Sequence, residues 1–298
     1  MINRLKALLK DERVFLNEKL DRHTTFKVGG PSKALLLVNT EEELKAVLKL
    51  LKEENEDFFI LGNGSNLLVS DEGYDGYVIK LSGDFLDMRL ESDCIVAGAG
   101  VLLSKVCTFA RDNSLSGLEF AYGIPGTVGG AMVMNAGAYG GEMKDVTESV
   151  SLLYKDEVIT RTCEEMRFGY RDSIIKHDDY IALKTRFKLK KGNAEEIVAA
   201  MADYMERRRS KQPLEFPSAG STFKRPEGAF AGKLIEDSGL KGFRVGGACV
   251  SPKHAGFVVN DQNGTAADIN ELMKQVAQKV KEDSGYILEP EVIRIGKF

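Results

Sequence analysis

Residues 123–141 form a glycine-rich stretch, GIPGTVGGAMVMNAGAYGG, with seven glycines in nineteen positions and no charged side chain. Inside a regular helix or strand, each glycine costs about 0.5–1 kcal/mol relative to alanine. Such density is expected where a ligand or another backbone segment must approach closely. Long loops of this kind are often functional. The stretch therefore predicts close approach by a ligand, and a tight turn between domains is the alternative.

A shorter glycine loop, LGNGSN at 61–66, directly follows the apolar run FFIL at 58–61. Successive Gly, Asn and Ser residues favour a loop whose backbone N–H groups converge, which suits a phosphate. A plain strand–turn–strand connection is the alternative, because Gly-Asn turns are common in hairpins. Together the two glycine loops suit a ligand with a diphosphate and a large flat ring.

Two familiar nucleotide-binding loops are excluded. No Gly-Lys-Ser/Thr follows these glycines, so a Walker A loop is absent. The run VAGAGVLLSKV at 96–106 places Gly-x-Gly between a strand-like and a helical pattern. Leu103, however, stands where a third glycine would allow the helix to pack closely on the strand. A nicotinamide Rossmann site is therefore not expected.

Strand-like and helical patterns alternate along the chain, which predicts a mixed α/β and α+β fold. We expect three domains, over residues 1–82, 83–190 and 191–298, with a linker at 188–193. Expected helices span the N-terminus, 40–55 (with a capping box from Thr40 to Glu43), 101–114, 194–209, 229–239 and 265–283. Expected strands span 33–38, 58–61, 67–69, 77–81, 94–100, 146–154, 180–189, 242–250, 256–260 and 286–296.

Composition narrows the class of protein. A net charge of -4 argues against a protein that coats nucleic acid or an anionic membrane. The four cysteines lie far apart without a C-x-x-C pair, and the three histidines form no ligand motif, so reduced thiols and no metal site are expected. The N-terminus is interrupted by charges and resembles an amphipathic helix, not a signal peptide. These features predict a soluble cytoplasmic protein.

Six motifs occur in a set order: GNGSN, GIPGTVGGAMVMNAGAYG, FGYRDS, KQPLEFPSAGSTFK, KHAGFVVN and LEPEVIRIG. From about residue 20 to the C-terminus the chain thereby resembles the UDP-N-acetylenolpyruvoylglucosamine reductase family. The resemblance implies a two-subdomain FAD-binding fold of the vanillyl-alcohol-oxidase type plus a C-terminal substrate-binding domain. Only eight residues separate Arg171 from the strand near Tyr180, which leaves no room for a tyrosine-bearing insertion and implies the shorter subtype.

The resemblance also implies the activity. The family's members are cytoplasmic flavoprotein oxidoreductases that use FAD, with NADPH as co-substrate, to reduce UDP-N-acetylglucosamine enolpyruvate to UDP-N-acetylmuramate. Hydride passes from NADPH to the flavin and then to C3 of the enolpyruvyl group, and C2 receives a proton. The product serves peptidoglycan synthesis, and hence cell wall biogenesis, cell shape and cell division. The implied partner is a small UDP-sugar, with no nucleic acid or membrane, and a monomer is expected.

By resemblance, FAD contacts are expected at Leu61, Gly62, Asn63, Gly64, Ser65, Asn66, Gly123, Pro125, Gly126, Thr127, Gly129, Gly130, Asn135, Gly137 and Ala138. Substrate contacts are expected at Tyr170, Arg207, Lys211, Arg225 and His254. Two positions depart from the family pattern. Arg225 stands where asparagine is frequent, which leaves the contacts to the nucleotide sugar open, and Lys27 stands where arginine is common.

Three residues match the family's catalytic positions. Arg171 would hold the substrate carboxylate with its fork of donors, although an ion pair with Asp172 or another acid is the structural alternative. Glu291 would face that carboxylate with a shared proton, and its position near the chain end would bring the segment 286–298 back to the active site. Glu289 is the less favoured candidate, since strand alternation puts both glutamates on one face and only the motif separates them.

Ser221, within the proline-flanked loop QPLEFPSAGSTFKRP, matches the family's proton donor to C2. Local hydrogen bonding in a turn is the structural alternative. A serine nucleophile is not expected, because SAGST is not G-x-S-x-G and no histidine is near in sequence. Two other functions compete with the reductase: an FAD-dependent oxidase of small alcohols on the same fold, and a nucleotide-sugar binder without a cofactor.

Overall fold

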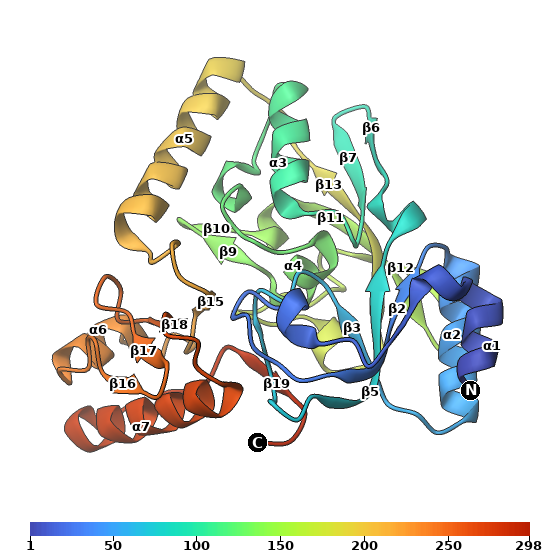
Figure 1. Ribbon diagram of the computed structural model, residues 1–298. Helices are drawn as coiled ribbons and strands as arrows, with labels where there is room; N and C mark the ends of the chain where they lie inside the picture. Colours follow the sequence, from blue (N-terminus) through green and yellow to red (C-terminus); the bar gives the residue numbers. More distant parts are fainter. The chain divides into compact units, whose positions relative to one another are not determined.

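The computed structural model describes all residues, 1–298 (Figure 1). Its α-helices are α1 (Ile2–Leu9), α2 (Glu41–Glu53), α3 (Leu103–Asp112), α4 (Val128–Met134), α5 (Ala194–Lys211), α6 (Ala231–Asp237) and α7 (Ala266–Ser284). Its strands are β1 (Val14–Leu16), β2 (Ser32–Val38), β3 (Phe58–Leu61), β4 (Leu67–Val69), β5 (Tyr74–Leu81), β6 (Met88–Glu91), β7 (Cys94–Gly98), β8 (Leu115–Ser116), β9 (Gly137–Ala138), β10 (Gly141–Glu142), β11 (Thr147–Tyr154), β12 (Glu157–Thr162), β13 (Ile181–Lys188), β14 (Lys190–Lys191), β15 (Ser218–Ser221), β16 (Arg244–Val245), β17 (Ala248–Val250), β18 (Phe257–Asn260) and β19 (Ile293–Ile295).

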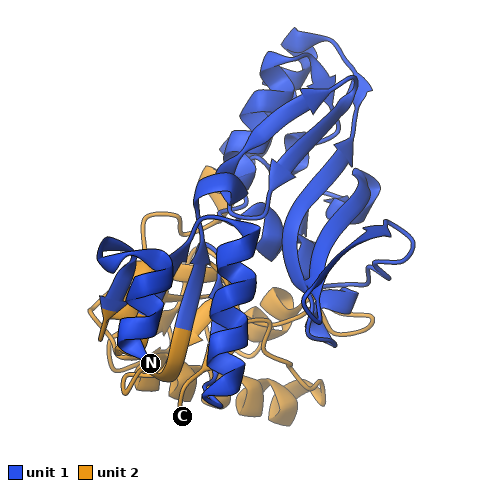
Figure 2. Ribbon diagram, turned by 90° about the vertical axis from the view of Figure 1, so that its right-hand side faces the viewer, with its two compact units in different colours: residues 1–15, 35–63, 78–207 blue, residues 16–34, 64–77, 208–298 orange.

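The chain divides into two compact units, which Figure 2 colours separately. Unit 1 comprises residues 1–15, 35–63 and 78–207, and unit 2 comprises residues 16–34, 64–77 and 208–298. Segments 16–34 and 64–77 thus group with the C-terminal part of the chain, although they precede it by more than a hundred residues. The three domains expected from the sequence follow a different division and remain a prediction.

Unit 1 contains a five-stranded antiparallel sheet in the order β12-β11-β13-β7-β6. Helices α3 and α4 pack against β7 of this sheet. A second sheet has the order β1-β2-β5-β3, and its strands β1, β2 and β5 are each divided between the two units. Helix α1 packs against α2 (Figure 1). Thr40 is the N-cap of helix α2, and its side chain accepts the Glu43 N–H, as the sequence pattern predicts. The Glu43 carboxylate also accepts the Asn39 N–H and pairs with Arg13.

Unit 2 is built on a four-stranded antiparallel sheet in the order β15-β18-β17-β16. Helix α7 packs on β16, β17 and β18, and its N-terminus carries a complete capping box between Thr265 and Asp268. The core is shared across distant segments, because Phe26, Val28 and Leu68 are buried with the α7 side chains. Near the C-terminus, β19 pairs in parallel with β4. The segment 16–34 therefore contributes Phe26 and Val28 to this core.

Four elements differ from their sequence predictions. The strand expected at 242–250 is two short strands, β16 and β17, which pair with each other antiparallel. The glycine-rich stretch, expected to be a long loop, contains α4 and the β9–β10 pair. The expected linker 188–193 contains β14, which pairs with β8. The expected strand 286–296 is reduced to β19, and residues before it form only an isolated bridge at Pro290, which has no N–H for a ladder.

No helix in the structure combines the length and the apolar character needed to cross a lipid bilayer. The structure also contains no group of three or more His, Cys, Asp or Glu side chains arranged to hold a metal ion.

Candidate functional site

The two glycine loops predicted to bind one ligand meet within unit 1. Asn63 donates its side-chain N–H to the carbonyl oxygen of Pro125 at 2.6 Å. A Cβ added at Gly62 would lie 2.7 Å from the Thr127 hydroxyl oxygen, which is closer than real Cβ contacts. Glycine is thus required at position 62 by the approach of the second loop. Leu61, which precedes it, is buried at the end of β3.

The glycines of α4 serve two different purposes. The Val128 and Gly129 N–H groups donate to the carbonyl oxygens of Val101 and Ala99, and a Cβ at Gly129 would meet the Ala99 Cβ at 3.0 Å. Gly129 therefore allows the helix to pack on its neighbour. Gly130 is exposed, and a Cβ there would meet only the Thr127 hydroxyl at an ordinary 3.5 Å. No packing within the protein demands a glycine at position 130.

The rest of the 61–66 loop belongs to unit 2 and contacts other segments there. Gly64 has a φ of +61°, and its carbonyl oxygen accepts the Thr25 N–H. Asn66 donates its side-chain N–H to the backbone carbonyl of Glu291 at 3.1 Å. Ser65 lies between them and is partly buried. The loop predicted to hold the cofactor is thus joined to the segment that carries the predicted glutamate.

Arg171 lies in a two-residue turn within unit 1. The turn is closed by Gly169 and Asp172, each donating its N–H to the other's carbonyl oxygen. Arg171 has a φ of +55°, a strained conformation for a residue with a side chain. Its guanidinium lies over the Tyr170 ring at 5.1 Å and donates to the carbonyl oxygen of Gly137 at 3.4 Å. The Asp172 carboxylate contacts His177 Nε2 at 2.8 Å, and Glu142 is a second acid whose charge interacts with that of Arg171.

Ser221 is the last residue of the edge strand β15. The strand is irregular between Ser218 and Ser221, where Gly220 has a φ of +75°. A bulge of this kind at the edge of a sheet changes the direction in which a side chain points. The expected rigid loop is therefore partly a strand, and Ser221 is exposed at its end.

Glu291 and Ser221 lie on neighbouring segments of unit 2. The Glu291 N–H donates to the carbonyl oxygen of Thr222 at 2.8 Å, and Pro290 forms an isolated bridge with Phe223. One carboxylate oxygen of Glu291, Oε2, is buried. Glu289 has a different environment, because its side chain is 69% exposed and pairs with Lys224 at 3.1 Å. Alternation along a strand predicted that the two glutamates would lie on one face. In the structure their side chains instead have different environments.

The predicted substrate-binding cations have partners of different kinds. On α5, Arg207 pairs with Asp203 at 2.8 Å and lies 5.9 Å from the Tyr204 ring centre. Lys211, four residues later on the same helix, is exposed. In unit 2, the Arg225 guanidinium lies 4.6 Å above the ring of Phe230, which is exposed. This cation–π contact gives Arg225 a defined orientation that its sequence context left open.

His254 is a partly buried side chain of unit 2. Its Nδ1 accepts the Gly256 N–H at 3.1 Å, and its ring contacts Phe257 edge to face. Burial lowers the pKa of His254 below its ordinary value of 6.5; its own backbone hydrogen bond and Glu236 oppose this shift, whereas Lys241 reinforces it. With Nδ1 as acceptor, the neutral ring carries its proton on Nε2.

This pKa shift predicts how stability depends on pH. Above the unfolded-state pKa of about 6.5, His254 is neutral in both the folded and the unfolded chain. As the pH falls, the unfolded chain takes up the proton first, so the free energy of unfolding decreases until the pH passes the folded-state pKa. We expect urea unfolding between about pH 7.5 and pH 5.5 to show a smaller stability loss for His254→Asn than for the unsubstituted protein. Equal losses in the two proteins would contradict the assignment.

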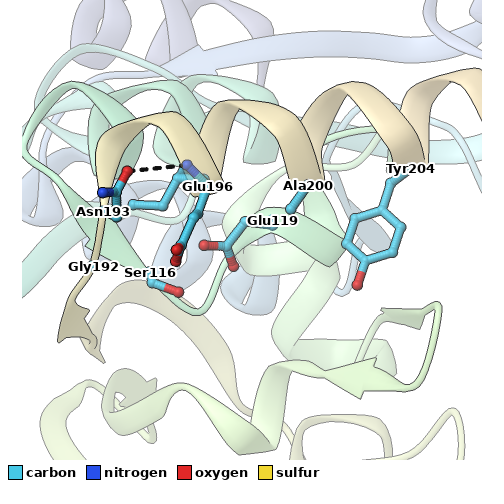
Figure 3. Close-up of a pocket in the computed structure, with 8 residues that line it drawn as sticks. Ser116, Glu119, Gly192, Asn193, Glu196, Ala200 and Tyr204 are labelled. Atoms are coloured by element: carbon cyan, nitrogen blue, oxygen red, sulfur yellow. Dashed lines mark hydrogen bonds between the residues drawn. The ribbon is translucent and has the colours of Figure 1, made fainter.

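A pocket of about 270 Å³ lies in unit 1 and contains none of the predicted site residues. Figure 3 shows its lining: Ser116, Glu119, Gly192, Asn193, Glu196, Ile197, Ala200 and Tyr204. The Asn193 side chain caps the start of α5 by accepting the Glu196 N–H. Two carboxylates and no cation line the pocket, so an anionic cofactor or substrate is not expected there.

The sequence matches two known protein families. Residues 212–295 match the family described as UDP-N-acetylenolpyruvoylglucosamine reductase, C-terminal domain, and residues 32–162 match an FAD binding domain. A UDP-N-acetylenolpyruvoylglucosamine reductase from Caldanaerobacter subterraneus subsp. tengcongensis is 47% identical over 298 residues, covering 100% of this chain and 98% of the relative. The chain belongs to this reductase family. A second member, from Alkaliphilus oremlandii, is 49% identical over 98% of this chain and 97% of its own length.

Solved structures agree with this membership. The family's reductase from Thermus caldophilus superposes with a TM-score of 0.82 at 40% identity, over 95% of this chain and 98% of that one. p-Cresol methylhydroxylase is similar in fold alone, with a TM-score of 0.58 at 12% identity, covering 98% of this chain and 88% of its own. The fold is thus the FAD-binding fold of the vanillyl-alcohol-oxidase type with the family's C-terminal domain.

Two tyrosines near the site were missed by sequence reasoning. Tyr139, between β9 and β10, stacks on Tyr204 of α5 with ring centres 4.7 Å apart and planes 13° apart. The pair ties the glycine-rich stretch to the helix that carries Arg207. Tyr139 was recognisable as the one aromatic residue among the glycines of 136–141, but its partner lies 65 residues later in the chain.

Proposed function

We infer that this protein catalyses the FAD-dependent reduction of UDP-N-acetylenolpyruvoylglucosamine to UDP-N-acetylmuramate. The observation that carries this conclusion is the 47% identity to a reductase of that name along the whole chain, together with the match to an FAD binding domain. NADPH is proposed as the co-substrate. We also propose that the protein works in the cytoplasm as a monomer, in the synthesis of peptidoglycan precursors.

The residues at the meeting point of the two glycine loops fit FAD. Gly130 leaves space beside α4 that a Cβ would fill and that no packing within the protein uses. The hydrogen bond from Asn63 to the Pro125 carbonyl oxygen joins the two loops there, and Thr127 lies next to Gly62. When bound, FAD supplies the hydride that the reduction needs. We propose that the residues within 61–66 and 123–138 assigned from the sequence are those that hold it, with Asn135 contributing through its backbone, because each polar atom of its side chain bonds to the protein.

Three residues are proposed to act on the substrate. Arg171 would bind the enolpyruvyl carboxylate through two parallel N–H donors, which stabilises the negative charge that develops when C3 receives hydride. Glu291, with one buried oxygen, would share a proton with the same carboxylate. Ser221, exposed on its edge strand, would transfer its hydroxyl proton to C2 as a general acid.

Binding of the nucleotide sugar is proposed to use Tyr170, Arg207, Lys211, Arg225 and His254. The three cations among them carry charge opposite to that of a diphosphate. The neutral His254 offers an Nε2–H donor that needs no charge. Arg225, oriented by Phe230, replaces a frequent asparagine of the family and would contribute a cation where that residue offers an amide.

Absorption spectroscopy and stopped-flow kinetics test the proposal. The purified protein is expected to be yellow, or to become so with added FAD, and NADPH should bleach the flavin bands. UDP-N-acetylenolpyruvoylglucosamine should then restore them. A flavin that the substrate failed to reoxidise would point to the oxidase alternative, whereas a protein that could not be loaded with FAD would favour the nucleotide-sugar binder.

The substitution Gly130→Ala tests where FAD lies. Alanine inside a helix is favoured over glycine by about 1 kcal/mol, and this position has room for a Cβ, so the FAD-free protein should melt at a higher temperature. If FAD packs against α4 there, its dissociation constant should nevertheless rise. Gly129→Ala is the matched control, because it should lower the melting temperature through its contact with Ala99. Unchanged FAD affinity in Gly130→Ala would place the cofactor elsewhere.

A further inference from the structure

Asn135 ends helix α4 in a fully buried position. It is 0% exposed and has a left-handed conformation, with φ 41° and ψ 54°, which asparagine tolerates better than most residues. Its side-chain NH₂ donates to the Glu142 carboxylate at 2.8 Å and to the carbonyl oxygen of Gly169 at 2.9 Å. Its side-chain oxygen accepts the Lys144 N–H at 3.0 Å. Both ends of the amide are therefore used within the protein.

The bond to Gly169 fastens the turn that carries Arg171. Gly169 is one of the two residues that close this turn. A second fastening lies just beyond the turn, where the Ser173 hydroxyl, in a residue only 1% exposed, donates to the carbonyl oxygen of Val133 at 3.0 Å. Both sides of the Arg171 turn are thus attached to residues 133–135, at the end of α4.

This double attachment explains how the strained backbone at Arg171 persists. A side-chain-bearing residue at positive φ costs on the order of 1 kcal/mol or more and is kept only where the surrounding structure determines it. Without the Asn135 and Ser173 bonds, the turn could relax to a commoner conformation. The guanidinium would then move, and a misplacement of about 1 Å can reduce a reaction rate by roughly 10²-fold.

We propose that Asn135 is a positioning residue for Arg171, so that the end of α4 sets where the guanidinium lies relative to the glycine-rich stretch. The proposal rests on the proposed function, in which Arg171 binds the substrate carboxylate. It gives the Asn135 side chain a role separate from contact with FAD, because each of its polar atoms already bonds to the protein. Ser173 has the same role from the other side of the turn.

The test compares Asn135→Gly, Ser173→Ala and the control Glu142→Gln in the FAD-loaded enzyme. Asn135→Gly keeps a residue that accepts the left-handed backbone and removes only the side chain. Ser173→Ala removes only one hydroxyl, so it serves if the first variant fails to fold. Glu142→Gln keeps an acceptor oxygen for Asn135 while removing the charge. Measurements are the FAD dissociation constant, the two half-reactions and hydrogen exchange of peptide amides.

We expect Asn135→Gly to slow reoxidation of the flavin by substrate by roughly 10- to 100-fold and to raise the substrate KM. Ser173→Ala should have the same effect in a weaker form. Flavin reduction by NADPH and FAD affinity should stay within about threefold of the unsubstituted enzyme in all three variants. Amides of residues 168–174 should exchange faster in Asn135→Gly, while those of β7 and β13 should not.

Loss of FAD affinity in Asn135→Gly with normal reoxidation at saturating FAD would overturn the proposal and make Asn135 a cofactor contact. Normal reoxidation with normal FAD affinity would overturn it as well. If the unsubstituted protein were not reoxidised by the substrate, the proposed function would fail, but exchange at 168–174 would still decide whether Asn135 holds the turn. Unchanged exchange there would reject the positioning role.

Discussion

Ser221→Ala is expected to leave flavin reduction by NADPH nearly unchanged and to slow substrate-dependent reoxidation by about 10²- to 10⁴-fold. The variant removes only the hydroxyl that we propose as the proton donor to C2. It should fold, because the Ser221 side chain is exposed at the end of an edge strand and alanine fits any environment that serine leaves. Stopped-flow measurement of the two half-reactions separates the effects.

Two further variants control this result. Ser218→Ala removes a hydroxyl from the same strand β15, three residues earlier, and is expected to leave both half-reactions unchanged. Ser221→Cys keeps a transferable proton and should retain part of the activity. An equal slowing of both half-reactions by Ser221→Ala would argue for a structural role of the hydroxyl and against proton donation.

Replacement of Arg171 should have the second large effect. Arg171→Ala removes the cation proposed to hold the substrate carboxylate as negative charge develops, and loss of one such contact typically lowers kcat by about 10²- to 10³-fold. Arg171→Lys keeps the charge without the two parallel donors, so it should recover only part of the loss. The substrate KM should rise in both, because the carboxylate is also bound in the ground state.

The backbone at Arg171 permits a sharper comparison. Glycine accepts a φ of +55° without strain, so Arg171→Gly should be more stable to urea than Arg171→Ala, although both lack the cation. Equal activity losses in these two variants would assign the effect to the side chain. A protein whose reoxidation was unaffected by Arg171→Ala would require another cation at the carboxylate.

Elements with strong local signals were predictable from the sequence. Helix α7, expected at 265–283, runs over Ala266–Ser284, because Thr265 and Asp268 cap its start and an apolar stripe recurs at helical spacing. Helix α4 was hidden by its glycines, although Thr127 caps it and Val128, Ala131 and Met132 form a short buried face. The high glycine content of this stretch predicted a loop, although its apolar residues recur at helical spacing. The predicted C-terminal strand was too long, because Pro290 has no N–H for a strand ladder and the strand forms only after it.

The candidate site also has features that the sequence predicted and features that it did not. The glycine loops and the positions of Arg171, Ser221 and Glu291 were identified from short motifs, and these motifs are contiguous in sequence. Contacts between residues that lie far apart in sequence were not predicted. They include Asn135 with Gly169, Tyr139 with Tyr204 and Asn66 with Glu291. Glu289 and Glu291 differ only through contacts of this kind, since one pairs with Lys224 and the other has a buried oxygen.

The sequence by itself determined the family, the flavin chemistry and the residues proposed to carry it, because these depend on side-chain type and short spacing. The glycine-rich stretch already predicted the close approach of a ligand or of another backbone segment. Only the tertiary structure distinguished Gly62 and Gly129, where a Cβ would approach neighbouring protein atoms too closely, from Gly130, where a Cβ would make only an ordinary contact. It also placed Phe26 and Val28 in the hydrophobic core formed with the C-terminal part of the chain. Both distinctions depend on contacts between segments remote in the chain, which no local pattern encodes.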